Sequence, residues 1–179
     1  MQNLQLATLK IPETERLTLH LLSEADLPEI FLLRSNPIVN KFIQRPLAMN
    51  MEEAFKFIVK IQTGLQLNNS ILWSICFKNS TQLIGTICLW KFSKDRTIAE
   101  LGYELMPKYH GQEIMNEAVQ AVLELGFNTI GLSAIEAFTH HANTSSIKLL
   151  LKNNFVAEPN RVDEGFPNNL IFSIHKSNL

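Results

Sequence analysis

The sequence predicts an α+β fold in which helices cover both faces of a mixed β-sheet. Three strand-like runs, 71–77, 83–92 and 97–106, follow one another with short polar separators, as in an antiparallel meander. Helical patterns precede and follow this meander, and helix and strand then alternate toward the C-terminus. This order of elements is what predicts the fold class.

One strand and two helices precede the meander. Residues 16–22 alternate between apolar and polar, as in a half-buried strand. Ser23 then caps a helix with acidic residues in its first turn, where the helix dipole favours them, and this helix extends to about Ser35. A second helix over 51–67 places its apolar side chains along one stripe.

Two helices, a strand and a hairpin follow the meander. The periodicity predicts a helix over about 113–128, a strand over 133–139 and a helix over 144–153. A hairpin near 155–158 and 170–175 ends the chain. Together with the earlier segments, these elements form a sheet with helices on both faces.

The composition indicates one globular domain over residues 1–179. Hydrophobic residues make up 46% and charged residues 18% of the chain, which argues against disorder, and no linker or repeat interrupts it. The net charge is −1 and no basic block occurs, so we expect no nucleic-acid partner. No signal peptide or membrane-length apolar stretch is evident. We therefore expect no membrane partner, a cytoplasmic location, and a monomer or homodimer.

The two cysteines predict neither a disulfide nor a metal site. Cys76 and Cys88 lie inside strand-like apolar runs, and no Cys-x-x-Cys or His-x-x-x-His pattern occurs. We expect both thiols to be reduced and buried, and we expect no metal cofactor.

The turn between the strand 97–106 and the next helix carries the clearest chemical signal. The strand ends before Pro107, and the chain turns at Gly111 into the helix. The N–H groups of a helix start lack partners, and together with the positive end of the helix dipole they suit a diphosphate. On this pattern alone a purely structural turn stays open, because many strand–turn–helix units bind nothing.

Four segments carry a family resemblance, in the order ETERLTLHLLSEADLPEIF, LIGTICLWKF, AELGYELMPKYHGQEIMNEA and NTSSIKLLLKNNF. They resemble the opening strand and helix, the third strand, the acetyl-CoA motif and the motif after the fifth strand of the GNAT acetyltransferase superfamily. The branch they resemble contains ribosomal-protein N-terminal (RimJ/RimL-like) and spermidine acetyltransferases. The resemblance implies a GNAT-type three-layer α/β/α fold. Its central sheet would be mixed, mostly antiparallel, and splayed between the fourth and fifth strands.

The resemblance also implies an acetyl-CoA site. The family signature Gln/Arg-x-x-Gly-x-Gly/Ala falls on residues 108–113, where Gly111 is kept and Lys108 and Glu113 depart from it. The Glu113 carboxylate either competes with the phosphates or points to solvent as a favourable first-turn acid. The pantetheine arm would bind the splayed strands like an added strand. The implied contacts are Leu105, Met106, Lys108, Tyr109, His110, Gly111, Gln112, Glu113, Ile114, Phe138, Asn143 and Ser146.

Catalytic candidates follow from the same resemblance. The tyrosine that protonates the thiolate in many family members corresponds to Leu150, so Ser146 is the implied proton donor. Alternatively, the Ser146 hydroxyl only satisfies backbone N–H groups at the start of its helix. Glu100 is the implied base, because burial would raise its pKa, unless it faces solvent. Glu164 is a looser match for the base. A backbone N–H near Met106 is the expected oxyanion donor.

Tyr103 and Glu104 are the expected substrate-pocket residues. Tyr103 corresponds to the family's Gly-Tyr pair and would line the pocket. Glu104 shares a strand face with Glu100 and would order a water molecule between them. His140 and His141 follow the fifth strand, so they lie either near the cofactor sulfur or simply on the surface.

The resemblance therefore implies an N-acetyltransferase. It would transfer acetyl from acetyl-CoA to a primary amine, either a protein N-terminal α-amine or a small-molecule amine, by direct attack in a ternary complex. The alternative is a GNAT-fold acyl-CoA-binding or regulatory module with weak or lost catalysis, and Glu113 is the residue that favours it.

Overall fold

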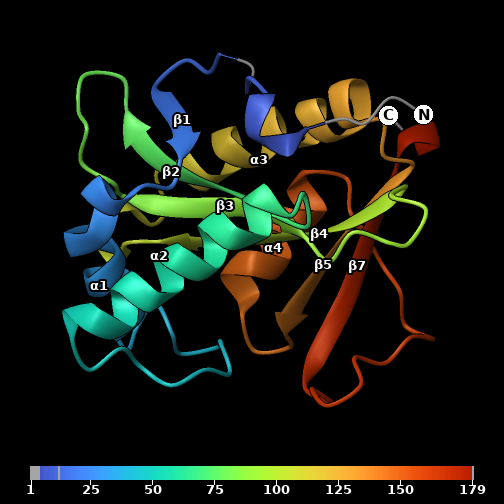
Figure 1. Ribbon diagram of the computed structural model, residues 1–179. Coiled ribbons are helices and arrows are strands. Elements are labelled where there is room, and N and C mark those ends of the chain that lie inside the picture. The colour runs from blue at the N-terminus through green and yellow to red at the C-terminus, as the bar shows by residue number, and fades with distance from the viewer. Residues whose placement is uncertain (1–4, 12, 179) are drawn as a thin grey trace.

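One seven-stranded sheet organises the molecule (Figure 1). The computed structural model describes residues 5–11 and 13–178. The strand order is β1-β2-β3-β4-β5-β7-β6, with β4 and β5 parallel and the other neighbours antiparallel. The strands are β1 (Leu17–Leu21), β2 (Ile71–Phe77), β3 (Gly85–Trp90), β4 (Ile98–Leu105), β5 (Ala134–His140), β6 (Val156–Ala157) and β7 (Asn169–His175). This arrangement confirms the mixed, mostly antiparallel sheet.

Helices cover both faces of the sheet, which confirms the three-layer prediction (Figure 1). On one face lie α1 (Leu27–Ser35) and α2 (Met51–Gln66); on the other lie α3 (Ile114–Glu124) and α4 (Thr144–Lys152). Short 3-10 turns occur at Leu6–Thr8, Glu24–Asp26, Pro107–Tyr109 and Lys176–Asn178, and a π-helical turn follows α3 at Leu125–Ile130.

The sheet separates two hydrophobic clusters. Alternate residues of a strand point to opposite faces. In β2, Trp73 and Ile75 therefore pack in the cluster under α3, whereas Leu72 and Cys76 pack in the cluster under α1 and α2. Both faces are covered, which is why the β2 sequence is almost continuously apolar.

The expected elements are present, with shifted ends that have local causes. The first helix begins as a 3-10 turn after Ser23 and becomes α-helical at Leu27, because Pro28 lacks an N–H and suits a first turn. The third strand ends at Trp90 rather than Phe92, because Lys91 adopts a left-handed backbone with φ 45°. The helix expected to reach residue 128 passes into the π-helical turn after Glu124.

The strands β4 and β5 pair over a short stretch and then separate. Their parallel ladder joins Ile98–Glu100 to Ala134–Glu136 and stops there. Beyond it, β4 stays paired with β3 as far as Leu105, and β5 stays paired with β7 as far as His140. This confirms the splay between the fourth and fifth strands. We call the space between the two unpaired edges the β4–β5 gap.

Both cysteines are free thiols; Cys76 is buried as expected, whereas Cys88 is only partly shielded from solvent. Burial raises the pKa of Cys88 to about 12 and that of Cys76 to about 11, so neither is a ready thiolate at neutral pH. Across residues 5–11 and 13–178, no cluster of three His, Cys, Asp or Glu side chains is placed to hold a metal ion. Within the same residues, no helix has the length and apolarity that a membrane crossing needs.

Candidate active site

The turn that precedes α3 lies at the end of β4, beside the β4–β5 gap. Gly111 has φ 71°, a left-handed backbone that favours glycine, and a side chain added there would meet nothing within 4 Å. The first backbone hydrogen bond of α3 runs from Glu117 N to Glu113 O at 3.1 Å. The N–H groups before Glu117 therefore lack partners inside the helix, and such groups at a helix start suit an anion.

Polar side chains of this turn bind its own backbone. His110 Nε2 lies 3.0 Å from Leu105 O, and Gln112 Nε2 donates to Lys108 O at 2.9 Å. Arg16, the residue before β1, donates to Gln112 O at 3.0 Å. These bonds fix the shape of the turn and engage its polar side chains locally.

The Glu113 carboxylate is paired with a neighbouring helix. Its Oε2 lies 2.5 Å from Lys152 Nζ at the end of α4, and both side chains are more than half exposed. Glu113 also has a left-handed backbone, with φ 60°, at the position where the family signature has a small residue. The side chain is exposed, as one alternative expected, but its charge is neutralised by Lys152.

Two hydroxyl groups meet at the start of α4. Asn143 caps this helix by accepting the Ser146 N–H at 3.2 Å, and Ser146 Oγ lies 2.8 Å from Tyr103 Oη. Ser146 is only 8% exposed. Burial raises the pKa of Tyr103 to about 12, although the bond to Ser146 opposes this. Both groups therefore keep their protons at neutral pH and can donate them.

Glu100 lies on the opposite face of β4 from Tyr103, since the two are three residues apart in a strand. It is 9% exposed, and its Oε2 accepts a hydrogen bond from Lys91 Nζ at 2.8 Å. Burial raises the pKa of Glu100, while Lys91 lowers it and Asp163 raises it further. Glu100 is thus a buried carboxylate, and the solvent-facing alternative is wrong. The candidate base and the candidate proton donor approach β4 from opposite faces.

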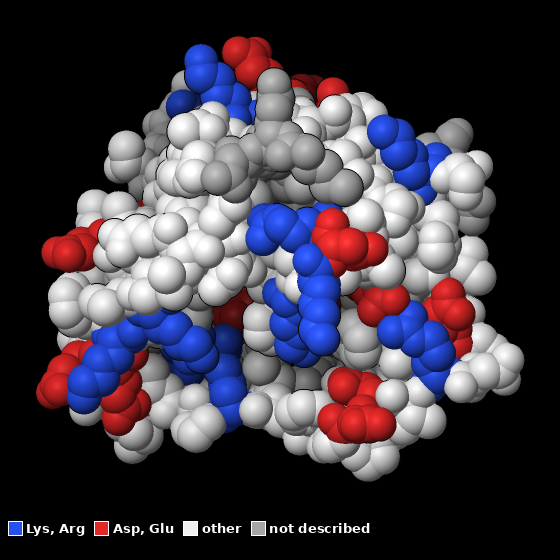
Figure 2. Space-filling model, turned by 45° about the vertical axis from the view of Figure 1, so that its right-hand side comes forward, with Lys and Arg blue, Asp and Glu red and all other residues white. Residues whose placement is uncertain are grey.

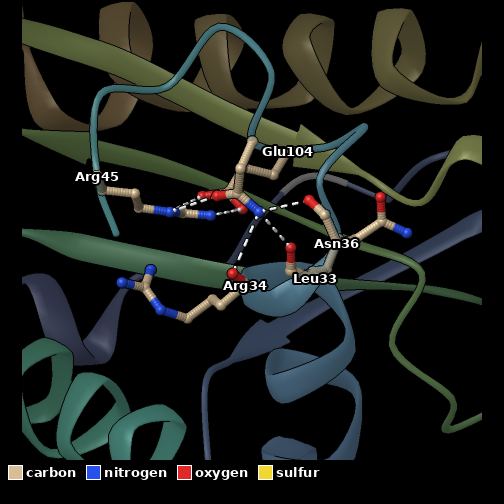
Figure 3. Close-up of polar contacts among 6 residues, drawn as sticks. Leu33, Arg34, Asn36, Arg45 and Glu104 are labelled. Carbon is tan, nitrogen blue, oxygen red and sulfur yellow. Dashed lines mark hydrogen bonds and ion pairs between the residues drawn. The ribbon is translucent and has the colours of Figure 1, made fainter. Parts of the chain in front are cut away.

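Glu104 is bound by an arginine instead of sharing a water molecule with Glu100. Arg45 donates from Nη1 to Glu104 Oε1 at 2.6 Å and from Nη2 to Oε2 at 2.7 Å (Figure 3). Arg45 Nε donates to Asn40 Oδ1 at 2.6 Å, and Asn40 Nδ2 donates to carbonyl oxygens at the end of α1, including that of Leu33 at 2.9 Å. The expected role of Glu104 therefore changes from water binding to anchoring the segment between α1 and α2.

The remaining candidates have less direct support. Glu164 is exposed, and within the described residues no hydrogen bond or ion pair engages its side chain. The Met106 N–H donates to Ile84 O at 2.9 Å, so it is not available as an oxyanion donor. His140 stacks on Phe42 with ring centroids 5.5 Å apart, which gives it a packing role at the end of β5.

Comparison with known proteins agrees with this geometry. The family model described as "Acetyltransferase (GNAT) domain" matches residues 16–156. The chain belongs to this family, and so to the acyltransferases. A relative, the N-acetyltransferase YoaA of Bacillus subtilis, whose function is uncharacterised, is 32% identical over 148 residues, which cover 83% of this chain and 84% of YoaA.

Solved GNAT structures share the fold. RimL, a ribosomal L7/L12 α-N-protein acetyltransferase solved with coenzyme A, has a TM-score of 0.78 at 18% identity and covers 94% of this chain and 99% of its own. Spermidine N-acetyltransferase from Vibrio cholerae, solved with coenzyme A and spermine, also has a TM-score of 0.78, at 20% identity, with coverage of 90% and 96%.

Sequence reasoning missed the cations around this GNAT site. Arg45 holds Glu104, Lys91 holds Glu100, and Arg34 lies at the end of α1 near Arg45. One signal was available: between Glu29 and Glu52 the chain has three cations and no acid. On the face shown in Figure 2, groups of basic side chains have acidic side chains beside them, around a hollow. Ion pairing of this kind explains why net charge alone did not reveal the cations.

Proposed function

We propose that this protein is an acetyl-CoA-dependent N-acetyltransferase of the RimJ/RimL-like branch, acting in the cytoplasm as one domain over residues 1–179. Its acceptor is a primary amine, either a protein N-terminal α-amine or a small-molecule amine. The observation that carries the proposal is the β4–β5 gap beside the Gly111 turn. Two unpaired strand edges suit a pantetheine arm, and a helix start suits a diphosphate.

In this proposal the backbone of the Gly111 turn binds the diphosphate. Leu105, Met106 and Phe138 border the gap that receives the pantetheine arm. The pairing of Glu113 with Lys152 supports cofactor binding, because it neutralises the carboxylate that would repel phosphate. The remaining contacts proposed along the turn and at the start of α4 are Lys108, Tyr109, His110, Gln112, Ile114 and Asn143.

Acetyl-CoA supplies a thioester whose carbonyl carbon the amine attacks, so that a C–N bond forms, the C–S bond breaks and coenzyme A leaves as a thiol. Glu100 accepts the proton that the amine loses, and its raised pKa suits this task. Ser146 donates a proton to the leaving sulfur, and Tyr103 replaces that proton through their 2.8 Å hydrogen bond. Glu164 is a second candidate base, on the loop before β7.

An acceptor screen that measures free-thiol release tests the proposal. The screen should contain peptides with free N-termini, polyamines and amino acids, each with acetyl-CoA. We expect thiol release that depends on one class of amine, together with a mass increase of that amine by one acetyl group. Thermal stabilisation by coenzyme A without thiol release from any amine would favour the alternative, a cofactor-binding module without catalysis.

A further inference from the structure

The segment between α1 and α2, residues 36–50, spans the β4–β5 gap on one face of the sheet. At one side it is fixed to β4 by the bidentate pair of Arg45 and Glu104. At the other side Phe42 stacks on His140 at the end of β5. An amine that approaches the gap from this face therefore passes the side chains of this segment and of the end of α1.

This wall of the gap carries surplus positive charge. From residue 30 to residue 51 the sequence contains Arg34, Lys41 and Arg45 and no Asp or Glu. Glu104 forms its ion pair with Arg45, and its single negative charge cannot balance both Arg45 and the nearby Arg34. Lys41 Nζ lies 5.1 Å from the centroid of the Phe42 ring, so this second cation is also close to the gap.

Within the part of the chain that the structure describes, the Arg34 guanidinium forms no ion pair of its own, although the Glu104 carboxylate lies close enough to act on its pKa. Its Cζ lies 3.8 Å from the centroid of the Phe57 ring, which fixes the plane of the guanidinium group. Among residues 5–11 and 13–178, no hydrogen bond or ion pair engages this side chain. In Figure 3 its guanidinium group lies on the same side as that of Arg45 but outside the dashed network that holds Glu104. Burial, followed by the charge of Arg45, lowers the pKa of Arg34 to about 10, while the charge of Glu104 opposes this shift.

Apart from Glu104, which Arg45 binds, two further acidic groups lie elsewhere around the gap. Glu100 is on β4, and Asp163, on the loop before β7, is close enough to raise the pKa of Glu100. A partly buried charge is costly unless a partner compensates it, and a guanidinium group pairs best with the two oxygens of a carboxylate. The site therefore has a negative part, suited to an amine, and a positive part in which one carboxylate, Glu104, faces two arginines, Arg34 and Arg45.

We propose that the acceptor is a primary amine that also carries a carboxylate, and that Arg34 binds this carboxylate. The inference rests on the proposed function and narrows it to amino acids or to peptides with an acidic residue near the N-terminus. A polyamine would bring further cations toward Arg34 and Lys41, which like-charge repulsion disfavours. Arg34 is thus a specificity-determining residue.

Matched acceptors test this inference. Three peptide amides, Ser-Glu-Ala-Tyr, Ser-Gln-Ala-Tyr and Ser-Lys-Ala-Tyr, differ in charge at one position. A second arm, which separates small acids from peptides, compares free glutamine, the acidic member because it keeps its α-carboxylate, with glutaminamide, which lacks that carboxylate. We expect kcat/KM to be highest for the acidic member of at least one arm. In Arg34→Gln, it should fall about tenfold to a hundredfold for that acceptor, as expected for lost charge-assisted hydrogen bonds, and change little for the neutral one.

The control is Arg96→Gln, since Arg96 also stacks on a phenylalanine, with Cζ 4.6 Å from the Phe92 centroid, but lies in the β3–β4 hairpin. It should leave the preference for acidic acceptors intact. Equal or better turnover of neutral or lysine-containing acceptors by the wild-type protein would overturn the inference while leaving the proposed function standing. An equal loss on acidic and neutral acceptors in Arg34→Gln would also overturn it. Absence of thiol release with every acceptor would overturn the proposed function and this inference together.

Discussion

The two sides of the β4–β5 gap are built by different means. At the Gly111 turn, left-handed residues and helix-start N–H groups form the surface, and polar side chains bind the turn's own backbone. At the segment 36–50, a charged side chain reaches 59 positions along the chain, from Arg45 to Glu104. A surface made of backbone tolerates side-chain changes such as Lys108 and Glu113. The charge of a surface made of side chains changes with a single substitution. We therefore expect differences in acceptor choice between relatives to arise at the segment 36–50.

The largest effect is expected at Ser146, at the start of α4. Replacing it with alanine removes the proposed proton donor and the partner of Tyr103, so kcat for Ser146→Ala should fall about a hundredfold. The affinity for coenzyme A should change much less. Steady-state kinetics and calorimetric titration with coenzyme A measure the two quantities. Ser145→Ala is the matched control, because Ser145 is an exposed neighbour in the same helical turn; unchanged kcat in Ser146→Ala would remove the assignment.

Breaking the ion pair on the acceptor side should affect stability. Glu104→Gln leaves Arg45 without its carboxylate in a pair whose side chains are only 17% exposed. We expect a loss of about 2 kcal/mol in the free energy of unfolding, or a Tm lower by about 4–8 °C. On the cofactor side, Glu113→Gln breaks an exposed pair and should cost less than about 0.5 kcal/mol. Equal losses of stability in Glu104→Gln and Glu113→Gln, measured by thermal denaturation, would show that the ion pairs on the two sides contribute equally to stability.

The cofactor side is tested with two glycines. Gly111 and Gly131 both have positive φ, and an added side chain meets nothing within 4 Å at either. Alanine should therefore cost each position a similar stability, about 1 kcal/mol. Only Gly111→Ala places a methyl group where the diphosphate is proposed to bind, and we expect KM for acetyl-CoA to rise about tenfold. A similar rise in Gly131→Ala would contradict the location of the site.

The pH dependence tests Glu100 and produces a smaller effect. Burial raises the pKa of Glu100, so activity that needs its ionised form should fall, as pH decreases, at a pH above that of an ordinary glutamate. Lys91 lowers this pKa, and Lys91→Met should therefore move the fall in kcat/KM to higher pH. The measurement is kcat/KM as a function of pH for the wild-type protein and for Lys91→Met. A shift toward lower pH in Lys91→Met would exclude Glu100 as the base.

The sequence predicted the features that depend on local pattern. Strand and helix periodicity gave the element order, and Asn143 and Gly111 were expected at helix starts, where backbone geometry selects such residues. The pairs that shape the chemistry join distant positions: Tyr103 meets Ser146 and Arg45 meets Glu104. No local pattern encodes such contacts, because they depend on how the elements pack.

Three sequence expectations changed for this reason. The Met106 N–H is occupied because the residue just before β3, Ile84, presents its carbonyl oxygen to it. Glu104 is occupied because the segment after α1 folds back over β4. Glu113 is neutralised because α4 ends beside it, which brings Lys152 within reach. In each case a residue was identified at the correct place in the fold, but its partner was not visible from neighbouring residues.

The central claim is that the Gly111 turn binds a diphosphate next to the gap between β4 and β5. Thermal denaturation with coenzyme A, and separately with pantetheine, which has the same arm without the diphosphate, tests it most directly. A ligand that binds only the folded protein stabilises it by about 2.7 kcal/mol at a hundred times its Kd. We predict a clear rise in Tm with millimolar coenzyme A, little rise with pantetheine, and a reduced rise in Gly111→Ala. An unchanged Tm with coenzyme A, or equal shifts with both ligands, would contradict the claim.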